Sequence, residues 1–217
     1  MIPSTQELLA DWDFVNPTTI RSKNTDFETE IGDVLQPDFY PQFKLKRWNN
    51  EFNFSIRPVL PGYAYDQMAT QGNEVRVRYG NIGFRFRIDP PEIDQALDYP
   101  RGLNFETILF SAPLTNTIDF TVNTKGAVFG LQLPLTPQQI VAGNNRPAHA
   151  EYSIAIYAAK RHNQYETGKL AHLYRPRVIE NNGTRSWGRW SVISQSLIQL
   201  SFAPALLLSG AYPIRIR

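Results

Sequence analysis

The sequence predicts an all-β fold: an antiparallel β-sandwich, for which a jelly roll is one candidate topology, with an extended N-terminal arm. Three observations predict it. Segments from residue 44 onward alternate apolar and polar residues with a period of two. Aromatic residues make up 12% and charged residues 19% of the chain, with 16 Pro and 13 Gly, which suits strands joined by tight turns. Neither a long helical pattern nor a repeat of fixed length occurs.

The alternation predicts roughly ten strands. In EVRVRY (74–79), for example, the valines and the tyrosine alternate with Arg76 and Arg78. The strand candidates are 51–57, 74–79, 82–88, 104–110, 117–123, 127–133, 151–159 (the longest without interruption), 170–179, 186–193, 196–202 and 211–217. One apolar face per strand predicts two sheets that bury these faces against each other. Residues 136–142 are expected to form one helical turn, and 203–209 a short helix.

Residues 1–43 are predicted to be an acidic N-terminal arm, and residues 44–217 the β-sandwich domain. The arm holds eight acidic and two basic residues, a net charge of −6, and the remainder carries +8. Ser4 and Glu7 have capping-box spacing, so a short helix is expected there. Residues 13–43 show little periodicity and should be irregular. The arm is either a solvated acidic tail or lies on a basic surface of its own or a neighbouring copy.

Composition excludes several kinds of site. The chain has no cysteine, which excludes disulfides, thiolate catalysis and cysteine-bound zinc. The first residues do not resemble a signal peptide, and no apolar run approaches the roughly 18 residues that a membrane helix needs. The acidic loop 89–98 lacks EF-hand spacing, so a solvated loop is preferred to a calcium site. We expect no metal, no cofactor and no membrane partner.

The segment NQYETGKLAHLYRP (163–176) gathers many functional side chains. A histidine there could act in catalysis, but no Gly-x-Ser-x-Gly motif or cysteine accompanies it. A polar corner between two strands explains the segment better, and a contact with a neighbouring subunit is the next alternative. We therefore expect no enzyme activity. A carboxylate-based hydrolase would need two acids facing each other in a cleft. The interface candidates here are Tyr165, Glu166, Lys169, His172 and Arg175.

Four arginines form the most informative charge pattern. Arg76 and Arg78 alternate with apolar residues in one strand of a predicted hairpin, and Arg85 and Arg87 do so in the other. Alternation places all four guanidinium groups on one face, where they suit an acidic partner surface. A merely solvated face is the alternative. Nucleic-acid binding is not expected, because the aromatic residues point the other way and no recognition motif is present.

Three tryptophans suggest a different function. Trp48, Trp187 and Trp190 could stack on sugars, as in a β-sandwich module that binds a host-surface glycan. Such a module needs exposed, coplanar aromatic rings in a groove. A structural protein would bury the same residues, which is the preferred interpretation.

Four segments carry a resemblance to a known group of proteins. They occur in the order LTNTIDFTVNTKG, LPLTPQQ, AIYAAKRHNQYETGKLAHLYRPRVIENNGTRSWG and AYPIRIR. Together with WNNEFNFSIR (48–57), they resemble uncharacterised β-rich proteins encoded in tailed-bacteriophage and environmental viral genomes, over about residues 48–217. The resemblance implies a virion or virion-associated structural protein and supplies no catalytic residues.

We therefore expect a bacteriophage virion structural protein that is made in the host cytoplasm and resides in the virion. It would be a capsid decoration or cement protein, or a component of the neck or tail. Its partners would be other virion proteins or copies of itself, and its mechanism would be protein–protein assembly. The glycan-binding module is the alternative.

Overall fold

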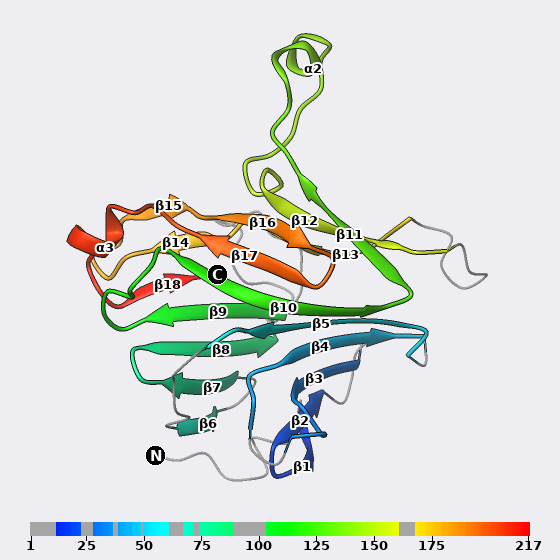
Figure 1. Ribbon diagram of the computed structural model, residues 1–217, viewed down its shortest axis with the longest axis vertical. Helices are drawn as coiled ribbons and strands as arrows, with labels where there is room; N and C mark the ends of the chain where they lie inside the picture. Colours follow the sequence, from blue (N-terminus) through cyan, green and yellow to red (C-terminus); the bar gives the residue numbers. More distant parts are fainter. Residues whose placement is uncertain are drawn as a thin grey trace.

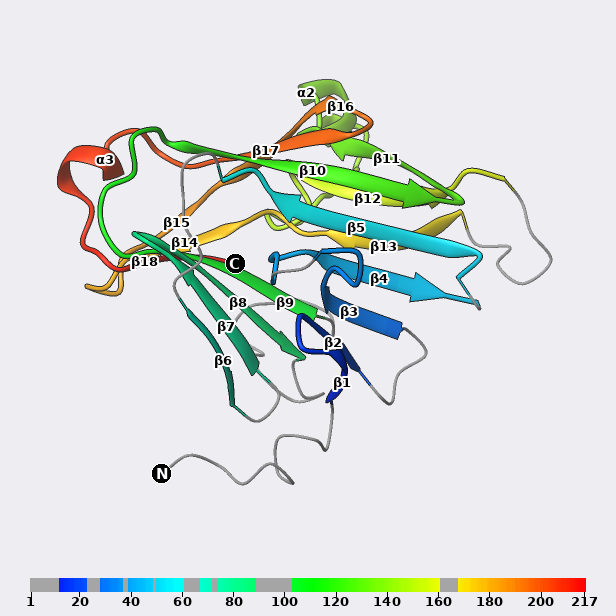
Figure 2. The ribbon, with the colours of Figure 1, turned by 60° about the horizontal axis from the view of Figure 1, so that its bottom comes forward.

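The computed structural model of this protein describes residues 12–22, 28–36, 39–48, 50–60, 67–71, 74–88, 103–160 and 168–217. Over these residues the chain is mostly β-strand, arranged in several antiparallel sheets, with two short helices (Figures 1 and 2). The expectation of a mostly-β fold is confirmed. Within the described ranges, no helix is long and apolar enough to cross a membrane. The helix expected near Ser4 lies outside them.

The largest sheet has eight strands in the order β1-β2-β3-β4-β5-β10-β17-β16. Its strands are β1 (Trp12–Asn16), β2 (Thr19–Ser22), β3 (Glu28–Gly32), β4 (Phe43–Arg47), β5 (Phe52–Pro58), β10 (Thr117–Lys125), β17 (Leu197–Ser201) and β16 (Arg189–Ser194). All neighbours pair antiparallel. In β10, alternation buries Ile118, Phe120 and Val122, so one face of this sheet is apolar.

A second sheet has seven strands in the order β15-β14-β18-β9-β8-β7-β6. Its strands are β6 (Gln67–Gln71), β7 (Glu74–Tyr79), β8 (Ile82–Ile88), β9 (Leu103–Leu109), β14 (Arg177–Ile179), β15 (Arg185–Trp187) and β18 (Ile214–Ile216). These neighbours are also antiparallel. The chain passes between the two large sheets after β5, β9, β15 and β17, which joins them into one unit.

A third sheet of three strands flanks the eight-stranded sheet. It consists of β11 (Ala127–Gln132), β12 (Ser153–Ala158) and β13 (Lys169–Leu173). Phe129 of β11 packs edge-on against Phe54 of β5, with ring centroids 6.3 Å apart. The connection from β11 to β12 carries α2 (Pro137–Val141) and projects from the body of the molecule (Figure 1). The other helix, α3 (Leu206–Ser209), lies between β17 and β18.

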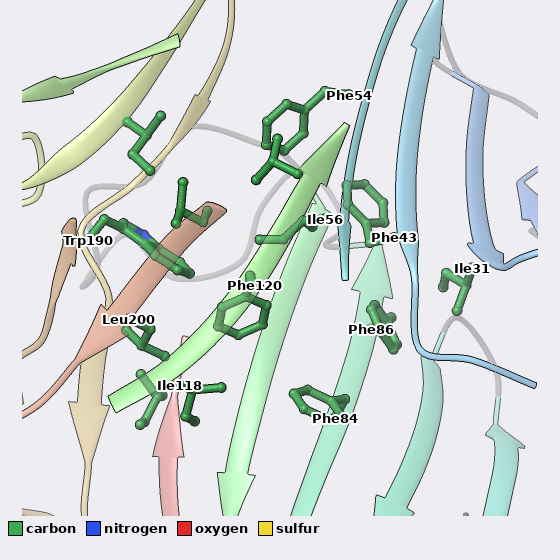
Figure 3. Close-up of a cluster of buried hydrophobic side chains, with 14 of the residues drawn as sticks. Ile31, Phe43, Phe54, Ile56, Phe84, Phe86, Ile118, Phe120, Trp190 and Leu200 are labelled. Carbon is green, nitrogen blue, oxygen red and sulfur yellow. The ribbon is translucent and has the colours of Figure 1, made fainter. Parts of the chain in front are cut away.

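The apolar faces of the two large sheets meet in one continuous buried cluster. Figure 3 shows Phe84 and Phe86 of β8 and Phe120 of β10 within this cluster. The ring centroid of Phe120 lies 5.7 Å from Phe105 of β9 and 5.6 Å from Trp190 of β16. The edge-to-face contact between Phe120 and Phe105 connects the two large sheets, as expected from the pattern of apolar residues.

Most strands lie where the alternation predicts them. The hairpin 74–79 and 82–88 has the predicted bounds, and 136–142 contains the expected helical turn. Three expectations are wrong. Segment 170–179 is divided between β13 and β14, which belong to different sheets. Segment 151–159 is not the longest strand, because β12 has six residues and β10 has nine. Segment 186–193 is broken at Gly188, where an added Cβ would lie only 2.9 Å from the carbonyl oxygen of Ser201.

The expectation that residues 13–43 are irregular is also wrong, because they contain β1, β2 and β3. These strands have only four or five residues, too few for a clear period-two signal. Strand β3 pairs with β4, which begins at Phe43. The domain boundary after residue 43 stays a prediction.

Three acidic residues in the described part of this region form ion pairs within the chain. Glu30 of β3 lies opposite Arg21 of β2, whose Nη2 donates to its carboxylate over 2.7 Å. Lys46 of β4 also donates to Glu30, and to Glu28 over 2.9 Å. Asp33 forms an ion pair with Arg57 of β5. These contacts favour the interpretation that the acidic residues lie on a basic surface of their own chain over that of a solvated acidic tail.

Replacing Glu30 by glutamine is expected to lower the free energy of unfolding by about 2 kcal/mol at pH 7, because two charge-assisted hydrogen bonds are weakened. Burial raises the pKa of Glu30, but the hydrogen bonds from Lys46 and Arg21 outweigh it, so the pKa is lowered overall. The stabilisation is therefore complete above the usual carboxyl pKa of about 4.3 and is lost as the pH falls below it.

Urea unfolding of both proteins between pH 3 and pH 7 would measure this difference. The difference in the free energy of unfolding between wild type and Glu30→Gln should become smaller toward pH 3. Glu28→Gln is the matched control, because its carboxylate is 41% exposed and should contribute less. A gap that stays constant with pH would contradict the assignment of the effect to the charge of Glu30.

Candidate interaction face

The hairpin of β7 and β8 presents its arginines on one face. In the antiparallel register, Arg76 lies opposite Arg85, and Arg78 lies opposite Gly83. The valines between the arginines of β7 are buried in the core, whereas Arg76 and Arg78 are exposed. The expectation that Arg76, Arg78, Arg85 and Arg87 share one face agrees with this register. For Arg87, the structure gives only the position in the strand.

This face continues across the seven-stranded sheet, whose strands lie side by side in Figure 2. One row of laterally paired residues runs Arg78, Gly83, Ile108, Arg215, Ile179 and Arg185. The adjacent row on the same face holds Arg76, Arg85 and Glu106, and it continues on β18, β14 and β15 with Arg217, Arg177 and Trp187. We call this surface the arginine face, and its arginines are Arg76, Arg78, Arg85, Arg87, Arg177, Arg185, Arg215 and Arg217.

Only part of this charge is neutralised by carboxylates of the same sheet. Arg85 forms an ion pair with Glu106, whose side chain is 1% exposed, and Arg76 forms one with Glu74. Arg78, Arg185 and Arg215 are exposed, and no described carboxylate forms an ion pair with them. The arginine face therefore has an internal, structural pair at Arg85 and an excess of solvent-facing guanidinium groups around it.

Aromatic rings hold some of these guanidinium groups in place. Gly83 has no side chain, and a Cβ there would come within 3.0 Å of the ring of Phe110. The guanidinium carbon of Arg78 lies 4.4 Å from the centroid of the same ring. At the other edge, Arg177 lies 4.3 Å from the Trp187 ring. Stacking restricts these long side chains, which lowers the entropy that they lose on binding.

Sequence reasoning missed half of the arginine face. The alternation IRIR (214–217) was recognised as a strand and carries its own signal, since Arg215 and Arg217 share one side. Which strands flank it could not be read from the sequence, because β18 pairs with β9 and β14, which lie far away along the chain. Gly83 within a strand was the available signal for the overlying Phe110 ring.

The structure describes three of the five residues predicted as an interface around 163–176. Tyr165 and Glu166 lie outside the described residues. Lys169, which is exposed, and His172, which is half-buried, lie on β13, and Arg175 follows that strand. Their role in a subunit contact stays a prediction.

His172 contacts a serine but lacks the geometry of a catalytic base. Its Nε2 lies 2.6 Å from Oγ of Ser153, which is fully buried and donates its own proton to the carbonyl of Ala150 over 2.6 Å. Burial chiefly lowers the pKa of His172 to about 4, so the ring is neutral at neutral pH. Its Nδ1 has no hydrogen-bond partner among the described residues, so no carboxylate orients the ring there.

Arg175 is mostly engaged within its own chain. Its Nε donates to the carbonyl of Gly188 over 3.0 Å, and Nη1 lies 3.6 Å from Glu151. Its guanidinium carbon lies 5.2 Å from the ring of Tyr152 and 5.3 Å from that of Trp187. Arg175 therefore connects two segments: the link between β15 and β16, and the turn that precedes β12.

The three tryptophans do not form an open stacking platform. Trp190 is 5% exposed, and its Nε1 donates to the carbonyl of Tyr174 over 2.9 Å. Trp48 is half-buried against Phe52, with Arg47 lying 4.5 Å from its ring. Trp187 is half-buried and carries a stacked arginine. This disposition favours the structural interpretation of these rings over sugar stacking.

Comparison of the chain with protein-family models, with curated proteins and with solved structures finds no match. Across the described ranges, no group of three or more His, Asp or Glu residues is arranged to hold a metal ion.

Proposed function

We propose that this protein is a bacteriophage virion structural protein that acts by protein–protein assembly and catalyses no reaction. It would be a capsid decoration or cement protein, or a component of the neck or tail. The observation that supports assembly best is the arginine face, in which exposed guanidinium groups span a sheet with few carboxylates. The resemblance of residues 48–217 to phage-encoded proteins supports the virion as its location.

The proposal includes a β-sandwich as the architecture, with a jelly roll as its form. Two antiparallel sheets whose apolar faces share one buried cluster favour a sandwich. Repeated passage of the chain between these sheets is typical of jelly rolls. Such a body can present the arginine face to a partner.

The partner of the arginine face is proposed to be an acidic surface of another virion protein or of another copy. Arginine is enriched at interface cores because its planar fork binds carboxylates through paired hydrogen bonds. Glu28, Glu30 and Asp33 already pair with bases of their own chain, so these acids do not serve a neighbour. The carboxylates must come from another surface.

A test by removal of residues 1–43 would be uninformative, because it would take β1, β2 and β3 out of the large sheet. Charge reversal of exposed residues avoids this problem. We expect Arg78→Glu combined with Arg215→Glu to reduce incorporation of the chain into virus particles at least tenfold, the effect of about 1.4 kcal/mol. Quantitative mass spectrometry of purified particles would measure the copy number relative to the major capsid protein.

The matched control reverses two exposed lysines outside the arginine face, Lys125→Glu and Lys160→Glu, and should leave incorporation unchanged. Each outcome bears on one part of the proposal. Absence of the wild-type chain from particles would remove the virion assignment. Normal incorporation of the arginine variant would show that the arginine face is only solvated and that another surface makes the contact.

A further inference from the structure

A cavity lies where the chain crosses from β15 to β16. Its volume is about 330 Å³, within the range of small-molecule sites. It is lined by Asn116, Trp187, Arg189, Ser201, Phe202, Ala203 and Pro204. These residues come from the loop before β10, the crossover itself and the end of β17, so several strands fix its shape.

Arg189 supplies a positive charge to the lining of this cavity. Arg189 is exposed and lies opposite Ser201 in the register, and it forms no ion pair with any described residue. Its guanidinium carbon lies 5.1 Å from the ring of Tyr152, which restricts the motion of the side chain. Arg175 and Arg177 lie against neighbouring Trp187. An anionic group on a ligand would therefore be attracted here.

Neutral hydrogen-bonding groups line the same cavity. The amide nitrogen of Asn116 donates to the carbonyl of Phe202 over 2.8 Å, which fixes the side chain and leaves its Oδ1 as an acceptor. The backbone nitrogen of Phe202 donates back to Asn116 over 3.1 Å. The hydroxyl of Ser201 makes no hydrogen bond with the described residues, so it can donate to or accept from a ligand hydroxyl.

Apolar surface from Phe202 and Pro204 completes the lining. We propose that this cavity binds an acidic monosaccharide unit, such as a hexuronic acid, free or within an acidic glycan. Arg189 binds the carboxylate, Asn116 and Ser201 bind hydroxyls, and the apolar residues contact the C–H face of the ring. This site goes beyond the proposed assembly function and does not depend on it.

Isothermal titration calorimetry of the full chain with D-glucuronate, with D-glucose and with acetate tests this proposal. We expect glucuronate to bind with a Kd of about 1 mM and the other two compounds to bind at least tenfold more weakly. Arg189→Gln should weaken glucuronate binding at least tenfold. Lys160→Gln removes the same charge from an exposed position outside the cavity and outside the arginine face and should leave binding unchanged.

The outcomes separate the parts of the proposal. Absence of glucuronate binding at 20-fold the expected Kd, or equal binding by Arg189→Gln, overturns the site. Equal binding of acetate and glucuronate reduces it to a general anion site and overturns the sugar assignment. Saturation-transfer NMR on polymeric glucuronate then distinguishes a glycan-bound unit from the free sugar. None of these results depends on incorporation into particles, so failure here leaves the assembly proposal to its own test.

Discussion

Replacing Phe120 by alanine is expected to lower the free energy of unfolding by about 4 kcal/mol, the typical cost of removing a buried aromatic ring. Phe120 is completely buried at the centre of β10, between β5 and β17. Its ring contacts Phe105 of the seven-stranded sheet and Trp190 of the eight-stranded sheet. Its removal would leave a cavity at the junction that connects both sheets.

Urea unfolding monitored by circular dichroism would measure this loss. Leu114→Ala is the matched control, because Leu114 is 97% exposed and its truncation should change stability by less than about 0.5 kcal/mol. A loss below about 1 kcal/mol for Phe120→Ala would mean that the two sheets are not held together at this ring.

Replacing Arg85 by alanine is expected to cost about 3 kcal/mol, although Arg85 lies on the arginine face with residues proposed to bind a partner. Its partner Glu106 is 1% exposed, so truncation leaves a buried carboxylate without its cation. Arg85 itself is 18% exposed, which places the expected loss at the lower end for a broken buried pair.

A double-mutant cycle with Glu106→Leu would separate the pair from its surroundings. The double variant should be more stable than Arg85→Ala alone, because the uncompensated charge has been removed. Arg78→Ala is the control from the same face, and it should cost less than about 1 kcal/mol because Arg78 has no carboxylate partner in the structure as described. If Arg85→Ala and Arg78→Ala cost the same, the Arg85–Glu106 pair does not contribute to folding.

These two arginines show why charge pattern is an incomplete guide to a binding surface. Arg78 and Arg85 look equivalent in the sequence, since each alternates with apolar residues in one strand of the hairpin. They differ because β9 lies beside β8 and places Glu106 opposite Arg85. Tests of the arginine face therefore belong at Arg78, Arg185 and Arg215, where substitution should change binding more than folding.

Local alternation was sufficient to find most of the strands from β5 onward, the apolar face of each, and the hairpin carrying Arg76, Arg78 and Arg85. This works because side chains alternate across a strand irrespective of its neighbours. The first four strands escaped detection. They are short, and their pairing is stabilised in part by ion pairs such as Glu30 with Lys46. Such ion pairs produce no period-two pattern in the sequence.

The amino-acid sequence alone was enough to establish the mostly-β character and the apolar face of most strands from β5 onward, since both depend on residues that are neighbours along the chain. The order of the strands across each sheet became known only from the folded structure. The rows that bring Arg78 to Arg215 and Arg185, and the cavity that places Arg189 beside Asn116, join segments separated by 70 residues or more. Such pairings arise when distant strands bury their apolar faces together, and no local pattern encodes which strands will meet.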